Sequence, residues 1–403
     1  MTASVSCFSL VISGSLLLAI PVAQAGPMQD IGASSGPQCV GIDVNNSGYA
    51  VGACVESNGS ASGFVAQTPG GGVDLAHLVA GRNCSAVAIT NVGRIVGHCM
   101  NSNSLHTGVV WNATAPTSVQ ALQALVGGVR SKVTALSQSG AVAGVSLNAD
   151  NTALPVMWRN NETTARSLPA GLLGLVATNC VPADIDDHSE NPTMPNIVGN
   201  CPGSNGRPQP VLWGPGLLGV YASTALPLPA DALHCRATQV VNARILGQCD
   251  FGAQGGHAVL WSNPASAPLV LSTGAQRSNA KTLNANGHVI GHYPNTNGDA
   301  IPFHWDTTTN IRTDIAPPAG AQHATVVDIG DNDNVVGTGE MNDGTKRAFK
   351  WTPGGGSVDL GTLPGGKNSG PVALSQDGCQ MTGGSEAGSG QDLHAILQNL
   401  CSP

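Results

Sequence analysis

A short pattern recurs along the whole chain and constrains its fold more than any other feature. Each copy has an apolar strand-like segment, a turn rich in Asn, Asp and Ser, and an apolar step that ends in glycine, as in Ile42–Gly52. Successive closing glycines lie 44 to 55 residues apart, which gives eight units of the length typical of propeller blades. The closing glycines are Gly52, Gly97, Gly144, Gly199, Gly247, Gly291, Gly337 and Gly383.

The tryptophans keep the same register. The chain has six, and each lies 14 residues after a closing glycine. Only the first and last units differ, with Ala66 and Leu397 at the equivalent position. Tryptophans scattered over a surface would not keep one spacing, so we expect them to form a layer of the core. They are Trp111, Trp158, Trp213, Trp261, Trp305 and Trp351.

Each unit contains four short strands, separated by Asn- and Gly-rich turns that favour hairpins. A unit this small must stack against its neighbours to bury its apolar faces. The eighth unit ends after three strands, and Met28–Gly32 resembles the fourth strand of the preceding unit, Ser357–Gly361. We therefore predict an all-β fold, an eight-bladed β-propeller of four-stranded blades closed by an N-terminal strand. A seven-bladed ring or an open solenoid is the alternative.

The first residues have the features of an export signal. An apolar segment, Val5–Ile20, precedes Ala23-Gln24-Ala25, which is a typical cleavage site, and the segment is too short for a good membrane anchor. We predict a cleaved signal peptide over residues 1–25 and a single propeller domain over 26–403. The expected location is the periplasm or the outside of the cell, with no membrane span.

Composition and charge exclude several other classes. The chain is 41% hydrophobic and only 10% charged, which excludes a disordered polyelectrolyte. Its net charge of −8 argues against binding to a nucleic-acid backbone. We expect a monomer whose partner is an unidentified protein or glycan, with no nucleic acid bound.

The repeat also predicts how the ten cysteines after Cys7 pair. One set lies two residues after a closing glycine and the other about 13 residues before it, and units that lack one lack the other. The hairpin turn lies midway between them, so the two sulfurs face each other, and the last two cysteines pair by elimination. The spacing does not suit zinc, and disulfides require an oxidising compartment. The predicted disulfides are Cys39–Cys54, Cys84–Cys99, Cys180–Cys201, Cys235–Cys249 and Cys379–Cys401.

One segment carries a family resemblance. Arg347–Gly366, which reads RAFKWTPGGGSVDLGTLPGG, resembles the bacterial HAF-type extracellular repeat, and Ala373–Gly378 continues the pattern. His257 and His394 begin elements similar to the His-Ala-Phe element that names the family. The resemblance is close in units six to eight and weaker in units two to five. It implies secreted or surface repeat proteins without an established activity, and it supplies no catalytic residues.

One turn is rich in oxygen ligands. Asp328, Asp331 and Asp333 lie in it together with Asn332 and Asn334, which suggests a calcium loop. Asn and Asp also favour such turns on their own, and the alternation of acidic residues in known calcium loops is incomplete here. We predict a structural turn and no cofactor, with calcium at Asp328, Asp331 and Asp333 as the alternative.

Three histidines, His288, His292 and His304, lie in one unit, and His98 matches His292 in register. His288 and His292 share one face of a strand because they are four residues apart. Three imidazoles suit zinc, but no acidic residue in the pattern would orient them. We predict hydrogen-bonded or solvated strand histidines and no metal site.

Two other patterns resemble catalytic motifs. Ser278-Asn279-Ala280-Lys281 has the Ser-x-x-Lys spelling of penicillin-interacting serine enzymes, but it opens a strand and lacks the partner motifs. An acidic group in the enlarged turn of unit four would suit a glycosidase, whereas a tolerated surface insertion explains it more simply. The acidic group is Asp184, Asp186 and Asp187. We predict no catalytic and no cofactor-binding residues.

Three functions are compatible with these observations. The leading hypothesis is a non-enzymatic secreted or periplasmic protein that presents a binding surface to a protein or glycan, because no dense catalytic constellation is visible. The first alternative is a propeller hydrolase or lyase that acts on an extracellular polysaccharide or peptide, which requires carboxylates or histidines from several blades to converge. The second alternative is a structural component of the cell surface or matrix.

Overall fold

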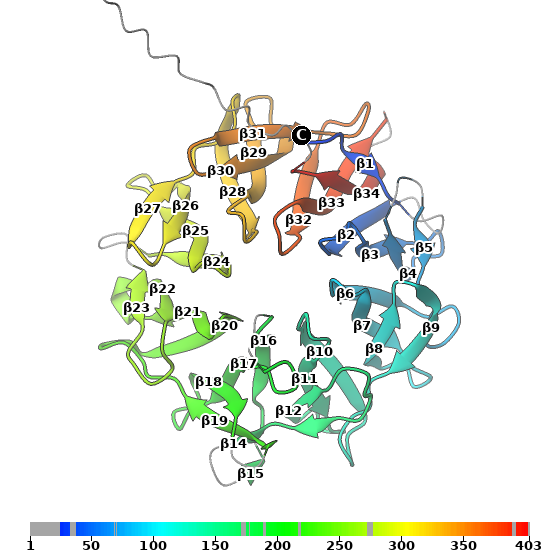
Figure 1. Ribbon diagram of the computed structural model, residues 1–403, viewed down its shortest axis with the longest axis vertical. Coiled ribbons are helices and arrows are strands. Elements are labelled where there is room, and N and C mark those ends of the chain that lie inside the picture. The colour runs from blue at the N-terminus through cyan, green and yellow to red at the C-terminus, as the bar shows by residue number, and fades with distance from the viewer. Residues whose placement is uncertain are drawn as a thin grey trace, which may run out of the picture.

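The computed structural model is an eight-bladed β-propeller, as predicted (Figure 1). Eight four-stranded antiparallel sheets surround a central axis, and the first strand of each blade lies innermost. The part of the chain that is described contains no α-helix and one short 3-10 turn, η2 (Gly252–Gln254). The structure describes residues 25–32, 38–67, 69, 71–170, 175–176, 178–187, 191–216, 219–271, 277–388 and 392–401.

The first four blades follow one another along the chain. Blade 1 consists of β2 (Gln38–Val44), β3 (Ala50–Val55), β4 (Ala61–Ala66) and β5 (Val73–Asp74). Blade 2 consists of β6 (Cys84–Ile89), β7 (Arg94–Met100), β8 (His106–Asn112) and β9 (Ala115–Ala121). Blade 3 consists of β10 (Arg130–Leu136), β11 (Val142–Leu147), β12 (Ala153–Trp158) and β13 (Arg166–Ser167), and a small hairpin of β14 (Pro169–Ala170) and β15 (Leu175–Val176) follows it. Blade 4 consists of β16 (Val181–Ile185), β17 (Ile197–Pro202), β18 (Pro208–Pro215) and β19 (Tyr221–Ala225).

The other four blades complete the ring. Blade 5 consists of β20 (His234–Val241), β21 (Arg244–Asp250), β22 (Gly256–Trp261) and β23 (Leu269–Leu271). Blade 6 consists of β24 (Asn279–Leu283), β25 (His288–Pro294), β26 (Ala300–Asp306) and β27 (Ile311–Asp314). Blade 7 consists of β28 (Ala321–Ile329), β29 (Val335–Met341), β30 (Lys346–Thr352) and β31 (Gly356–Gly361). Blade 8 consists of β32 (Ser369–Leu374), β33 (Gln380–Ala387), β34 (Asp392–Asn399) and the N-terminal strand β1 (Gln29–Asp30).

The N-terminal strand closes the ring as the sequence predicts. β1 pairs antiparallel with β34, with Gln29 opposite Leu397, and Ile31 is fully buried beside the pair. The imidazole of His394 meets the carboxylate of Asp30 at 2.7 Å. The last blade is therefore built from both ends of the chain, which leaves it without an unpaired inner strand and excludes the open solenoid.

The closing glycines and the aromatic rings form one core layer. A Cβ atom at Gly247 would lie 2.6 Å from the Trp261 ring, and one at Gly291 would lie 2.8 Å from the Phe303 ring. Only glycine leaves room for the ring across the hairpin, which explains the fixed spacing. The Trp261 indole also donates a hydrogen bond to the carbonyl oxygen of Pro227, which follows blade 4. The equivalent bonds run from Trp111 to Ala76, from Trp158 to Gln123 and from Trp213 to Pro169.

All five predicted disulfides are present. Four of them link the first and second strands of a blade, and the fifth, Cys379–Cys401, attaches the end of the chain to blade 8. In blade 3 the equivalent register holds Ser131 opposite Ser146. Ser131 is fully buried and donates a hydrogen bond to the carbonyl oxygen of Leu122. A serine pair therefore fits the same place without a covalent bond.

The disulfides fit a periplasmic or extracellular protein, because such bonds persist in oxidising compartments. No helix within the described residues is long and apolar enough to cross a membrane. The predicted signal peptide and Cys7 lie outside the described residues, apart from Ala25 at the predicted cleavage site.

We expect Gly247→Ala to destabilise the fold by about 1–3 kcal/mol, because the new methyl group would overlap the Trp261 ring and the carbonyl oxygen of Arg236. Urea denaturation of the purified chain measures the loss. Gly370→Ala is the matched control, since a Cβ there meets its nearest neighbour at an ordinary 3.5 Å. Equal losses in the two variants would contradict the shared glycine–aromatic layer.

We expect the double variant Cys39→Ser/Cys54→Ser to fold and to lose about 3 kcal/mol of stability, the chain-entropy value for a loop of this length. The serine pair of blade 3 shows that two hydroxyls fit this register. Denaturant midpoints of the oxidised proteins provide the measurement, and an unchanged midpoint would contradict the prediction.

Candidate functional site

The turns between the first and second strands of the blades form a hydrogen-bonded ring at one end of the axis. The backbone N–H of Asn46 donates to Oδ1 of Asn91 at 2.9 Å, and that of Asn91 donates to Oε1 of Gln138 at 2.7 Å. The pattern continues from blade to blade until the N–H of Asp377 in blade 8 donates to Oδ1 of Asn46 in blade 1. We call this end of the axis the channel mouth.

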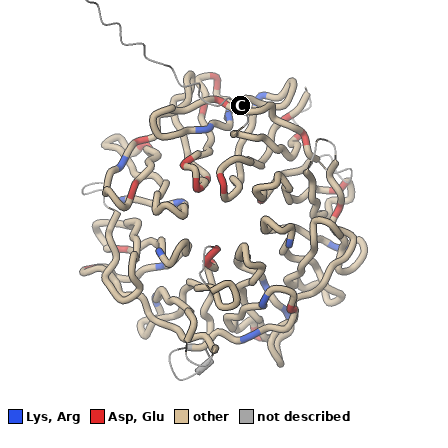
Figure 2. The backbone as a smooth tube through the Cα atoms, viewed as in Figure 1, with Lys and Arg blue, Asp and Glu red and all other residues tan. Residues whose placement is uncertain are grey.

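A cavity of about 170 Å³ opens at the channel mouth, and all eight blades contribute to its wall. Its polar side chains are amides, hydroxyls and carboxyls, and Figure 2 shows acidic residues at the inner ends of several blades. One residue from each blade illustrates the lining: Asp43, Ala88, Gln138, Asp187, Gln239, Asn284, Asp328 and Gln376.

Four side chains at one register position of the first strand link each blade to the next. Each follows directly after a β-bulge, which redirects the side chain toward the neighbouring blade. Each accepts a hydrogen bond from the backbone N–H of the residue one place further along in the next blade, at 2.7–2.9 Å. We call these four residues the clamp residues. They are Asp43, Asp184, Gln239 and Asp328.

Burial makes the three clamp carboxyls unusually weak acids. It raises the pKa of Asp43 to about 7, that of Asp184 to about 8 and that of Asp328 to about 6, although backbone N–H donors oppose the shift in all three. The charges of Asp328 and Asp187 raise the pKa of Asp43 further. Sequence reasoning missed Asp43 and Gln239. Their common offset from the closing glycine is the signal that would have found them.

Two of the predicted strand histidines act as clamps of a second kind. Nε2 of His292 accepts a hydrogen bond from the N–H of Val326 at 3.0 Å, and Nε2 of His98 does the same for Val133. Burial lowers the pKa of both imidazoles, that of His98 to about 4, so both are neutral acceptors at physiological pH. The prediction of hydrogen-bonded strand histidines is confirmed for this pair.

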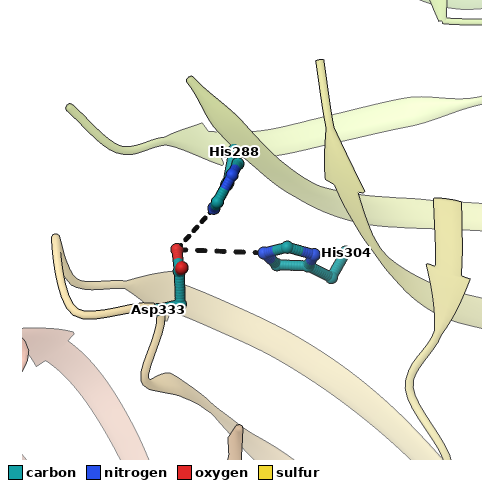
Figure 3. Close-up of side chains that lie close together, drawn as sticks. All are labelled: His288, His304 and Asp333. Atoms are coloured by element: carbon teal, nitrogen blue, oxygen red, sulfur yellow. Dashed lines mark hydrogen bonds and ion pairs between the residues drawn. The ribbon is translucent and has the colours of Figure 1, made fainter. Parts of the chain in front are cut away.

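The other two histidines of blade 6 meet an acidic residue from blade 7 (Figure 3). Nδ1 of His288 lies 2.6 Å from Oδ1 of Asp333, and Nε2 of His304 lies 3.9 Å from the same oxygen. Burial alone would raise the pKa of Asp333, but the two imidazoles and the Asn284 amide lower it to about 2. The expectation that no acidic residue accompanies these histidines is wrong, because the partner lies 45 residues away on the neighbouring blade.

The predicted turn around Asp333 is a turn, and its carboxylates point to different partners. Asp328 accepts from the N–H of Leu374, and Asp331 accepts from the N–H of Ala285. Since Asp333 faces the histidines instead, the three carboxylates hold together three blades. The alternative of calcium at Asp328, Asp331 and Asp333 stays untested.

The acidic residues of unit four are not a surface insertion. Asp186 is 2% exposed and accepts hydrogen bonds from the N–H groups of Asn242 and Ala243 in blade 5. Asp187 accepts from the N–H of Gln138 in blade 3 and lines the cavity. That prediction was wrong because it counted the length of the insertion without the unpaired N–H groups on either side.

The Ser-x-x-Lys resemblance has a structural cause. Ser278 occupies the register that holds cysteine in other blades and is 2% exposed. Its hydroxyl accepts a hydrogen bond from the N–H of Ala258 and donates one to the carbonyl oxygen of Leu271. It links strands of the preceding blade to its own, which agrees with a chance match to the enzyme motif.

No protein-family model matches this sequence, and no curated protein does. The resemblance to the HAF-type repeat therefore stays a prediction. The similarities that exist are to solved structures, and they are similarities of fold.

Three solved structures illustrate the likeness. Dipeptidyl peptidase 4 of Porphyromonas gingivalis has a TM-score of 0.55 at 9% identity, covering 91% of this chain and 60% of its own. Prolyl oligopeptidase B of Galerina marginata, bound to a 35mer hydrolysis and macrocyclization substrate, has a TM-score of 0.55 at 10% identity, covering 87% and 55%. The β-propeller domain of the Trilobed protease of Pyrococcus furiosus has a TM-score of 0.51 at 8% identity, covering 80% and 97%. The chain thus spans little more than half the length of the first two.

These neighbours correct the leading functional hypothesis. We expected a non-enzymatic binding surface because the sequence shows no catalytic constellation, but the propellers that this one resembles are parts of peptidases and a protease. The finding favours the alternative of a propeller hydrolase. The physical reason for the error is that a ring gathers single residues from separate blades, which leaves no linear motif.

We expect the stabilising effect of Asp184 to depend on pH. Its pKa is about 3.8 in the unfolded chain and about 8 in the fold, so its contribution is complete below pH 3.8 and is lost as the pH rises through about 8. Unfolding free energies of the wild type and Asp184→Gln at pH 5 to 9, all flagged as about one unit apart, should therefore converge at alkaline pH.

Gln239 offers the matched control, because it clamps the next pair of blades through an amide that does not titrate. The difference between the wild type and Gln239→Ala should stay constant over the same range. A difference for Asp184→Gln that grows with pH would contradict the raised pKa.

Proposed function

We propose that this protein is a peptidase-type propeller hydrolase that receives a peptide at the channel mouth. The observation that carries the proposal is the meeting of carboxyl groups from separate blades in one cavity, with pKa values raised into the neutral range. Perturbed carboxyls of this kind are what general acid–base catalysis at neutral pH requires.

Asp43 and Asp328 are the pair that the proposal assigns to the reaction. Both line the cavity, and they interact, since the charge of Asp328 raises the pKa of Asp43. With pKa values of about 7 and about 6, one carboxyl is ionised while the other still holds its proton. The ionised Asp328 would take a proton from the attacking water, and the protonated Asp43 would donate to the peptide carbonyl oxygen.

The lining favours a peptide over a polysaccharide. Gln138, Gln239 and Gln376 line the cavity with amide groups, which have both donors and acceptors for a peptide backbone. The described residues around the cavity include no aromatic ring against which a sugar could stack. The acidic mouth also complements the positive amino terminus of a peptide. The likeness to peptidase propellers agrees with this choice.

The location completes the proposal. Five disulfides fit a periplasmic or extracellular hydrolase. We propose that residues 1–25 direct export and are then removed, and that the HAF-type resemblance reflects the same secreted origin.

We expect Asp43→Gln and Asp328→Gln to lower kcat for peptide cleavage by about 10²- to 10⁴-fold, the usual contribution of a general acid or base. Glutamine is chosen because Gln239 shows that an amide at this register keeps the link to the next blade. Cleavage of a mixed library of unblocked peptides by the purified chain, followed by mass spectrometry, gives the rates.

Asp184→Gln is the matched control, since Asp184 makes the same link but is not among the described residues that line the cavity. It should keep wild-type kcat. The pH profile of kcat/KM should be bell-shaped with limbs near 6 and 7. No cleavage of any peptide by the wild type, or an equal loss in all three variants, would refute the proposal, and cleavage of polysaccharides alone would move it to glycosides.

A further inference from the structure

The histidine–aspartate group between blades 6 and 7 contains a polar atom that the protein itself does not satisfy. Nε2 of His304 is buried and has no hydrogen-bond partner, and the side chain is only 8% exposed. Its nearest acceptor, Oδ1 of Asp333, is 3.9 Å away, too far for a hydrogen bond. A buried nitrogen left in this state costs about 1–3 kcal/mol, so its orientation toward Asp333 calls for a ligand (Figure 3).

The structure assigns to His288, His304 and Asp333 a binding site for a divalent transition metal, with Zn²⁺ as the preferred ion. Two imidazole nitrogens and one carboxylate oxygen lie within 4.8 Å of one another. This ligand set is typical of zinc sites with three protein ligands and a fourth position open to water. His288 and Asp333 are partly exposed, so water can reach that position.

The separations suit a tetrahedral ion. Ligands 2.0 Å from such an ion lie about 3.3 Å apart, and the two observed separations, 2.6 Å and 3.9 Å, bracket that value. A movement of less than about 1 Å by the two imidazoles therefore completes the site. The positions come from strands β25 and β26 and from the β28–β29 turn, which the clamp network already fixes.

The surroundings resemble those of metal ligands in a further respect. Nε2 of His288 lies 3.6 Å from Oδ1 of Asp306, so a carboxylate is placed beside the nitrogen that the metal would leave free. Asn284 donates to Oδ1 of Asp333 at 2.8 Å and orients that carboxylate. The His304 ring packs against Trp351, with ring centroids 5.3 Å apart, which shields one side of the site from water.

Metal binding by the full chain tests the site without reference to catalysis. After treatment with EDTA and addition of ZnCl₂, the wild type should retain one zinc ion per chain on dialysis, and zinc should raise its melting temperature. His304→Ala and Asp333→Asn should weaken binding by more than about tenfold, and Asp306→Asn by about 10- to 100-fold. Co²⁺ in place of zinc should give the absorption bands of a tetrahedral site in the wild type alone.

His394→Ala is the matched control, because His394 forms a similar pair with Asp30 in blade 8 without a third ligand. It should bind zinc like the wild type. No zinc retained by the wild type, or equal retention by His304→Ala, would overturn the site. The outcome is separate from the peptidase proposal, which depends on Asp43 and Asp328.

Discussion

Side-chain hydrogen bonds to the backbone of the next blade hold this ring together. The eight blades are separate sheets, so no strand ladder joins them. Every unpaired N–H on an innermost strand would be costly if buried, and a side chain from the preceding blade accepts several of them. Where the first strand has only a small residue or threonine, as at Ala88 and Thr282, an imidazole on the second strand takes over. The geometry of the channel mouth is a result of this requirement.

The same requirement explains the weak acidity at the axis. A carboxyl that serves a neighbour's N–H must sit between two packed blades, where burial disfavours its charge more than the N–H donors favour it. Gln239 meets the structural need without a titratable group. The acids at Asp43 and Asp328 therefore add a property that the fold alone does not need, and this is why they are assigned to chemistry.

The fold was predictable because its determinants are periodic, whereas the site depends on pairs that the period conceals. The glycine and tryptophan spacing predicts blade number, closure by Met28–Gly32 and all five disulfides, since each constraint repeats within the chain. Asp43 and Asp328 lie at opposite ends of the sequence and meet only when the ring closes. Asp333 was missed as a partner of His288 because the analysis of that unit stopped at its own boundary. Interblade bonds recur at 44 to 49 residues, and that offset links the two.

The N-terminal strand has a consequence for the timing of folding. Asp30 meets His394 across 364 residues of sequence, so the eighth blade cannot be completed until nearly the whole chain has emerged. Contacts of such long range are slow to form, and an incomplete ring exposes strand edges to other chains. Blades 1 to 7 can assemble one by one as they appear, each held by its own hairpin. For this protein, the last event of synthesis is also the event that makes the first residues structured.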